Sequence, residues 1–177
     1  MKIFIAGAKS IHCLDEAVIQ KLNSIYQKGY DVLVGDCDGV DSSVQKHYAD
    51  LNYFKVTVYA SNGIARNNVG HWKVNAINVP SKLTGFDFYK QKDIAMADDA
   101  DYGFMIWDGQ SKGTLNNIVN LLFRNKNVLI YFAPLKKMTS VKSLDEMDRL
   151  VEICTQKVKA YYYLLSQQPL LLTTAPV

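Results

Sequence analysis

Cysteine and histidine are scarce in this chain of 177 residues, and neither is spaced as disulfides or metal ligands usually are. The three cysteines, Cys13, Cys37 and Cys154, are far apart and include no Cys-x-x-Cys pair, so neither a disulfide framework nor a zinc site is indicated. The three histidines lack the i, i+4 spacing of two ligands on one helix. We therefore expect no metal and no cofactor, and a reducing cytoplasm fits the free thiols best.

Long apolar runs and an excess of one charge are also missing. Only residues 3–6 form an apolar run before Gly7, which is far shorter than a signal-peptide core or a membrane span. We expect a soluble, cytoplasmic protein with no membrane partner. The formal net charge is +3 and the basic residues are scattered, which predicts that nucleic acid is an unlikely partner.

The composition that is present is typical of a globular domain, with 49% hydrophobic and 21% charged residues. A chain of this length can bury roughly 70% of its unfolded surface around one core. We therefore predict a single domain over residues 1–166. The remaining stretch, 167–177, has three leucines and no charge, so we expect a tail that is either frayed or docked on a partner subunit, as in a homo-oligomer.

Short apolar runs alternate with helical patterns along the chain. The predicted strands are residues 3–6, 31–34, 55–59, 102–107 and 127–132. Residues 71–79 are either a strand or an extended excursion, and residues 87–99 and 147–158 have helical patterns, the latter with a continuation to 165. This alternation predicts an α/β fold, a three-layer α/β/α sandwich with a mainly parallel Rossmann-like sheet of about five strands.

Polar residues at the expected helix starts predict caps. Asp15 and Asp41 are placed to cap the helices that follow them, and Ser143 with Glu146 has the spacing of a capping box.

The stretch 102–122 combines a buried strand, a turn with two glycines and a helix. The helix has an apolar stripe, and Asn117 lies off that stripe, near the start of the helix. At the carboxyl edge of a parallel sheet, free backbone N–H groups and the helix dipole favour an anionic ligand group. The alternative is that Gly113 and Thr114 only cap a core helix.

Two other loops follow predicted strands and should meet this one at the same edge. One is the turn from Gly35 to Asp41, and the other contains Arg66, whose guanidinium can grip phosphate in a bidentate manner. A lone loop arginine is otherwise usually solvated. We expect a ligand crevice between residues 7–10, 35–41, Arg66 and residues 109–117.

Taken together, these motifs resemble the SLOG superfamily of Rossmann-like proteins, related to the DprA, LOG and YspA-type families and more distantly to nucleoside 2-deoxyribosyltransferases. Residues 35–41 resemble the Gly-Gly-x-x-Gly-x-Asp turn of that group, Arg66 and Asn67 its Arg-Asn pair, and residues 108–114 its Asp-x-x-x-x-Gly-Thr segment. The resemblance implies a nucleotide or nucleotide-derived ligand, such as a nucleoside monophosphate or ADP-ribose, with phosphate near Gly113 and Thr114. The ligand-binding candidates are Gly7, Ser10, Gly35, Asp36, Gly39, Asp41, Arg66, Asn67, Asp108, Ser111, Gly113, Thr114 and Asn117.

Whether the protein is an enzyme stays open at this point. Hydrolytic and transferase members of the family usually have a glutamate where this sequence has Asn117, and an amide can neither form a covalent sugar intermediate nor act as a general base. The leading hypothesis is therefore binding or sensing of a nucleotide. The alternative is an N-glycosidase, phosphoribohydrolase or deoxyribosyltransferase in which Asp41, Asp93 or Asp108 supplies the carboxylate. A third hypothesis, single-stranded nucleic acid binding, is disfavoured by the low net charge.

Overall fold

A seven-stranded sheet with the order β4-β3-β2-β1-β5-β6-β7 organises the computed structural model, which describes residues 1–167. The strands are β1 (Lys2–Gly7), β2 (Asp31–Val34), β3 (Val56–Ser61), β4 (Lys73–Ile77), β5 (Tyr102–Trp107), β6 (Val128–Phe132) and β7 (Lys137–Val141). The helices are α1 (Glu16–Gln27), α2 (Val40–Asp50), α3 (Gly85–Asp99), α4 (Lys112–Phe123), α5 (Leu144–Val151) and α6 (Gln156–Ser166), with a 3-10 turn at Ala133–Leu135. Neighbouring strands are parallel except for β6 and β7.

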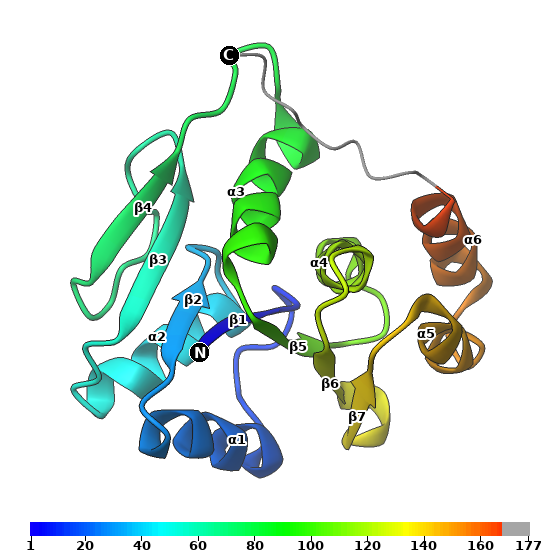
Figure 1. Ribbon diagram of the computed structural model, residues 1–177, viewed down its shortest axis with the longest axis horizontal. Coiled ribbons are helices and arrows are strands. Elements are labelled where there is room, and N and C mark those ends of the chain that lie inside the picture. Colours follow the sequence, from blue (N-terminus) through cyan, green and yellow to red (C-terminus); the bar gives the residue numbers. More distant parts are fainter. Residues whose placement is uncertain (168–177) are drawn as a thin grey trace.

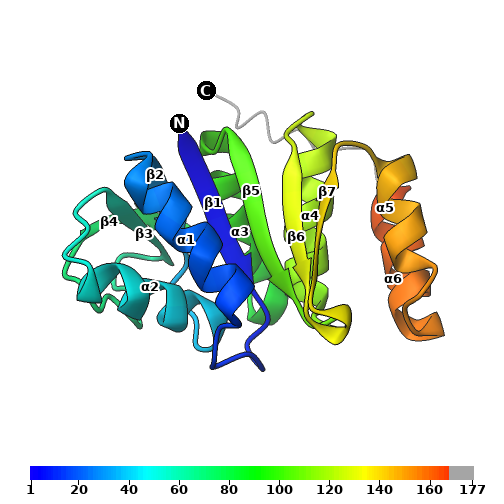
Figure 2. The same ribbon diagram turned by 90° about the horizontal axis from the view of Figure 1, so that it is seen from below.

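Helices cover both faces of the sheet (Figures 1 and 2). Helices α1 and α2 lie on one face, α3 and α4 lie on the other, and α5 and α6 stand beyond the β7 edge. Alternate residues of β1 enter different cores, since Phe4 packs with the α3 and α4 side and Ile5 with the α1 and α2 side. The predicted three-layer α/β/α sandwich is confirmed. No helix in residues 1–167 is long and apolar enough to cross a membrane, and the cytoplasmic location stays a prediction.

The five predicted strands are present, and the sheet has two more. Strand β4 lies inside the ambiguous stretch 71–79, and β7 lies in a stretch for which no strand is predicted. Both are edge strands, and most of their residues are at least partly exposed. An edge strand needs no continuous apolar run, so its sequence gives little strand signal.

The predicted caps have mixed outcomes. Ser143 Oγ accepts a hydrogen bond from the Glu146 amide at 3.2 Å, as predicted. Asp15 stands at the N-cap of α1 without capping it, because its carboxylate accepts from the Tyr131 hydroxyl instead. The cap predicted for Asp41 is also wrong, since Gly39 is the N-cap of α2 and Asp41 lies in the first turn.

The C-terminal helical pattern is split into two helices. The continuous helix predicted from residue 147 to 158 is interrupted after Val151, and Thr155 becomes the N-cap of α6. The chain can turn there because Val158, Tyr162 and Leu165 of α6 are buried together with Leu150 of α5. The tail predicted for 167–177 falls outside the described residues from 168 onward.

Candidate functional site

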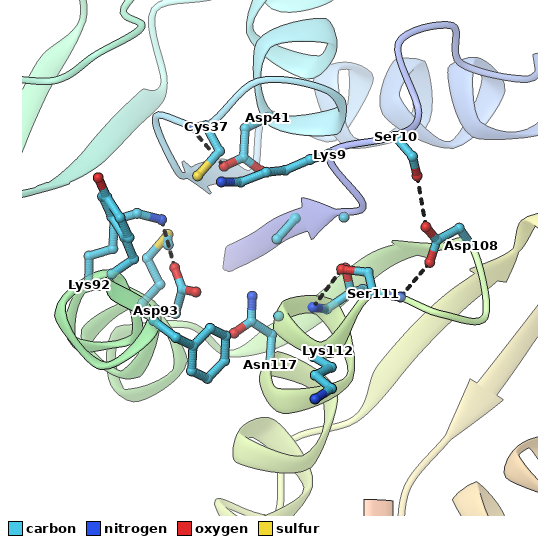
Figure 3. Close-up of a pocket in the computed structure, with 17 residues that line it drawn as sticks. Lys9, Ser10, Cys37, Asp41, Lys92, Asp93, Asp108, Ser111, Lys112 and Asn117 are labelled. Atoms are coloured by element: carbon cyan, nitrogen blue, oxygen red, sulfur yellow. Dashed lines mark hydrogen bonds and ion pairs between the residues drawn. The ribbon is translucent and has the colours of Figure 1, made fainter. Parts of the chain in front are cut away.

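A cavity of about 390 Å³ opens at the carboxyl edge of the sheet, between the ends of β1 and β5, the loop before α2, and helices α3 and α4. Nine predicted site residues line it (Figure 3): Gly7, Ser10, Asp41, Asp93, Asp108, Ser111, Gly113, Thr114 and Asn117. The same cavity is lined by Lys9, Cys37, Phe86, Tyr89, Lys92, Met96 and Lys112, among others. Residues that are far apart in the sequence therefore meet at one edge, as strand and helix alternation predicts.

The start of α4 is held in place by Asp108 and Ser111. Asp108 Oδ1 accepts hydrogen bonds from the amides of Gln110 at 2.9 Å and Ser111 at 2.7 Å, and its Oδ2 accepts from Ser10 Oγ at 2.7 Å. Ser111 Oγ then caps the helix by accepting from the Thr114 amide at 3.4 Å. These bonds fasten the loop after β1 to the loop after β5.

Two first-turn amides of α4, those of Lys112 and Gly113, are left without a hydrogen-bond partner in residues 1–167. A helix of this length places partial positive charge on such N–H groups. A Cβ atom built on Gly113 would meet no heavy atom within 4 Å, so this glycine leaves open space in front of the amides. The start of α4 is thus both accessible and suited to an anionic group.

Asn117 lies one turn further along α4 and faces the same cavity (Figure 3). Its side chain is buried, with 4% of the residue exposed. Its Oδ1 atom has no hydrogen-bond partner in the described part of the chain. Leaving a buried polar atom unpaired costs about 1–3 kcal/mol, so it marks a place where a ligand group would be favourable.

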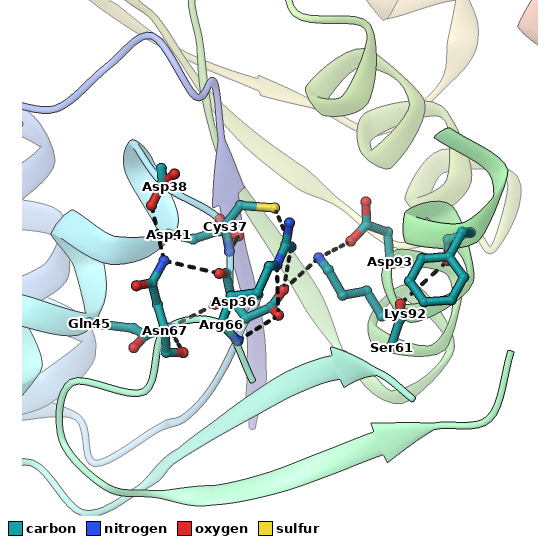
Figure 4. Close-up of polar contacts among 12 residues, drawn as sticks. Asp36, Cys37, Asp38, Asp41, Gln45, Ser61, Arg66, Asn67, Lys92 and Asp93 are labelled. Atoms are coloured by element: carbon teal, nitrogen blue, oxygen red, sulfur yellow. Dashed lines mark hydrogen bonds and ion pairs between the residues drawn. The ribbon is translucent and has the colours of Figure 1, made fainter. Parts of the chain in front are cut away.

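A chain of charged side chains leads to the cavity, and its last two members, Lys92 and Asp93, line it (Figure 4). The Arg66 guanidinium donates from Nε to Asp36 Oδ2 at 3.0 Å and from Nη2 to Asp36 Oδ1 at 2.7 Å. Lys92 Nζ lies 4.0 Å from Asp36 Oδ1 and donates to Asp93 Oδ1 at 2.7 Å. The side chain of Lys92 is only 3% exposed, so these carboxylates are what keeps its charge favourable.

The buried charges shift the pKa of several groups. Burial is the largest single effect on the pKa of Asp36 and raises it, but the hydrogen bonds from Arg66 together with the charges of Lys92 and Arg66 bring it below the ordinary value. Burial lowers the pKa of Lys92, but Asp93 and Asp41 outweigh it and the pKa is raised. For Asp41, burial is the largest effect, and it raises the pKa to about 7 although Lys92 opposes it. Asp41 can therefore exchange a proton near neutral pH.

Five of the predicted ligand-binding residues lie outside the cavity lining: Gly35, Asp36, Gly39, Arg66 and Asn67. The guanidinium of Arg66 is occupied by Asp36, and it also stacks 4.4 Å from the centre of the Tyr89 ring. Asn67 Nδ2 donates to the Asp36 carbonyl at 3.1 Å. The Arg66 and Asn67 pair thus braces the turn from Gly35 to Asp41.

The glycines of the first two loops serve close packing. A Cβ on Gly35 would overlap Asp41 Oδ2 and lie 2.8 Å from Lys92 Nζ. Gly39 has a φ of +75°, and a Cβ there would overlap the carbonyl of Lys9. A Cβ on Gly7, which does line the cavity, would overlap the carbonyl of Ile106. These positions allow the loops and the charged side chains to approach one another.

Sequence reasoning missed the contribution of α3 beyond Asp93. Phe86, Tyr89, Asp93 and Met96 all line the cavity, and their spacing of i, i+3, i+7 and i+10 places them on one helix face. This spacing is the sequence pattern from which the contribution of α3 to the cavity could have been predicted. No group of three or more His, Cys, Asp or Glu side chains able to hold a metal is found within residues 1–167.

Comparison with solved structures finds a protein of similar fold. No protein-family model and no curated protein sequence matches the chain. A solved structure of DNA processing protein A (DprA) from Helicobacter pylori, reported for its single-stranded DNA binding mode, matches with a TM-score of 0.57 at 12% identity. The match covers 93% of this chain and 80% of that one. This likeness shows a shared Rossmann-like fold.

The same match corrects one prediction. Nucleic acid was predicted to be an unlikely partner, and this is wrong, because a solved protein with this fold is a single-stranded DNA binder. The prediction relied on the formal net charge of +3, which is a sum over the whole chain. Such a sum says nothing about how cations and aromatic rings are distributed over one surface.

The role of Arg66 can be tested by removing it. We expect Arg66→Ala to lower the free energy of unfolding by about 2 kcal/mol at pH 7, since Asp36 would stay buried without its main donors. The lowered pKa of Asp36 makes this contribution present above the ordinary Asp pKa and lost as pH falls below it, so the effect should shrink towards pH 3. Urea denaturation at both pH values measures it. An Arg66→Ala protein of unchanged stability that binds ligand poorly would contradict the bracing role.

Proposed function

We propose that the cavity binds a nucleotide or a nucleotide-derived ligand of the nucleoside monophosphate or ADP-ribose type. In this proposal the phosphate accepts hydrogen bonds from the Lys112 and Gly113 amides, and the ribose hydroxyls pair with the Asn117 amide. All the groups involved belong to one domain, which we assign to residues 1–166. The observation that carries the proposal is the unpaired, buried Oδ1 of Asn117, one turn from the free amides of α4.

The arrangement supports a ligand with an anionic end and a hydroxyl-bearing middle. Free amides at a helix start favour phosphate over a neutral group. An amide side chain both donates and accepts, which matches a ribose hydroxyl that does the same. Asn117 has no carboxylate, so this contact supports binding without cleavage.

The test compares Asn117→Ala with Asn120→Ala, which removes an amide from the same helix outside the cavity lining. Isothermal titration with AMP should show affinity falling about tenfold or more for Asn117→Ala, since at least one hydrogen bond to a buried atom is lost. The Asn120→Ala protein should bind as wild type does. Equal affinity of Asn117→Ala and wild type would contradict the proposed ribose contact.

An enzymatic function is a second candidate, favoured by carboxyl groups in the cavity. Asp41 has a pKa raised to about 7 by burial, which suits proton transfer near neutral pH. The other two candidate carboxylates are Asp93 and Asp108. Asp93 is the better placed nucleophile, because both oxygens of Asp108 already accept hydrogen bonds. Chromatography for free base released from nucleotides separates the candidates, and turnover on the order of 1 per second or faster would favour the enzyme.

Single-stranded nucleic acid is a third candidate, supported by the DprA likeness and by aromatic rings at the cavity. Phe86 and Tyr89 line it while remaining 48% and 39% exposed, and Lys9 Nζ lies 5.9 Å from the Tyr89 ring centre. Aromatic rings beside cations are what base stacking on a single strand uses. Salt-dependent binding of a labelled oligonucleotide that AMP displaces would place a strand end in the cavity.

A further inference from the structure

Helix α3 places a carboxylate at the cavity, that of Asp93, and one of its oxygens is an unused hydrogen-bond acceptor. Asp93 Oδ1 accepts from Lys92 Nζ at 2.7 Å. Its other oxygen, Oδ2, has no hydrogen-bond partner in residues 1–167, and the side chain is 17% exposed within a residue that lines the cavity. This oxygen is therefore available to a donor on the ligand.

Asp93 lies on the side of the cavity away from the proposed phosphate contacts. Figure 3 shows Lys92 and Asp93 on one side of the cavity, Ser111 and the start of α4 on the other, and Asn117 between them. A nucleotide has the same order of groups, with base, ribose and phosphate in sequence. Phe86 and Tyr89 lie on the same face of α3 as Asp93 and offer apolar surface to a planar ring.

We infer that Asp93 selects the base by accepting a hydrogen bond from its exocyclic amino group. This inference rests on the proposed nucleotide-binding function. Adenine and cytosine carry an amino group where hypoxanthine and uracil carry a carbonyl oxygen. A carbonyl oxygen at that position would face Asp93 Oδ2 as a second acceptor, and neither oxygen can donate to the other. The site therefore takes adenine or cytosine nucleotides in preference to their keto counterparts.

The experiment titrates AMP against IMP, and CMP against UMP, by calorimetry. Wild type should bind the amino member of at least one pair about tenfold more tightly, as expected for one hydrogen bond to a charged group. Asp93→Asn should abolish or invert this preference, because an amide can donate to a carbonyl oxygen. Asp87→Asn makes the same change on the exposed side of α3 and should keep the wild-type ratio.

The outcomes separate this inference from the proposed function. Binding of all four nucleotides with equal affinity by wild type would overturn the base selection while leaving nucleotide binding in place. A wild-type ratio retained in Asp93→Asn would overturn the role of this residue. If none of the four binds, the proposed function and the inference fail together. The wild-type affinity ratios need no variant, so equal affinities would overturn the base selection even if Asp93→Asn folds poorly.

Discussion

Gly113→Leu is expected to reduce nucleotide affinity at least about 100-fold, corresponding to a loss of about 2.7 kcal/mol of binding free energy. The reason is steric, because a side chain at this position would enter the cavity in front of the free α4 amides. No heavy atom lies within 4 Å of the Cβ position, so the substitution should not disturb the protein itself. Replacing a helical glycine should even raise the free energy of unfolding slightly.

Gly113→Ala provides the graded comparison. Its methyl group occupies less of the cavity, so the loss of affinity should be smaller than for leucine, whereas stability should rise in both variants. Calorimetry with AMP and thermal denaturation of the same samples measure the two effects. A Gly113→Leu protein that is folded and binds AMP like wild type would show that the ligand does not approach the start of α4.

Asp41 should produce the largest pH dependence of stability. Burial raises its folded-state pKa from the ordinary 3.8 to about 7. The folded protein therefore holds this proton more tightly than the unfolded chain does, and the contribution is favourable below pH 4 and lost as pH rises through 7. Relative to Asp41→Asn, wild type should lose on the order of 3 kcal/mol of unfolding free energy between pH 4 and 8.

Asparagine is the suitable replacement because it does not titrate and keeps an oxygen that can accept from the Cys37 amide, now 3.2 Å from Asp41 Oδ2. Asp38→Asn changes an exposed carboxyl in the same turn and serves as control, with a pH profile parallel to wild type. Urea denaturation from pH 4 to 8 gives all three curves. Parallel curves for wild type and Asp41→Asn would mean that Asp41 is ionised across this range in the folded state.

The sheet could be predicted where burial leaves a local pattern. Residues 102–107 form an apolar run because β5 is central and covered on both faces, and the predicted bounds match those of the structure. Strand β7 has no such run, because it lies at an edge and pairs antiparallel only to β6. The break between α5 and α6 could not be predicted from the sequence either, because the apolar residues on both sides of it continue one helical stripe.

The candidate site could be predicted in part for a similar reason. Loops that follow parallel strands must meet at one edge, so Ser10, Asp41 and Gly113 could be placed together from their positions alone. Arg66 could not be understood in this way, since its partner Asp36 is 30 residues away and the pairing depends on the folded turn. Lys92 was missed because a buried lysine gives no sequence signal until its carboxylate partners are known.

The central claim is that phosphate binds at the start of α4 and ribose at Asn117, and nuclear magnetic resonance tests it most directly. In a titration of ¹⁵N-labelled protein with AMP, the Gly113 backbone amide and the Asn117 side-chain amide should shift together, with one dissociation constant. Adenosine, which lacks the phosphate, should bind more weakly and leave the Gly113 resonance nearly unmoved. AMP that saturates the protein while both resonances stay in place would contradict the account.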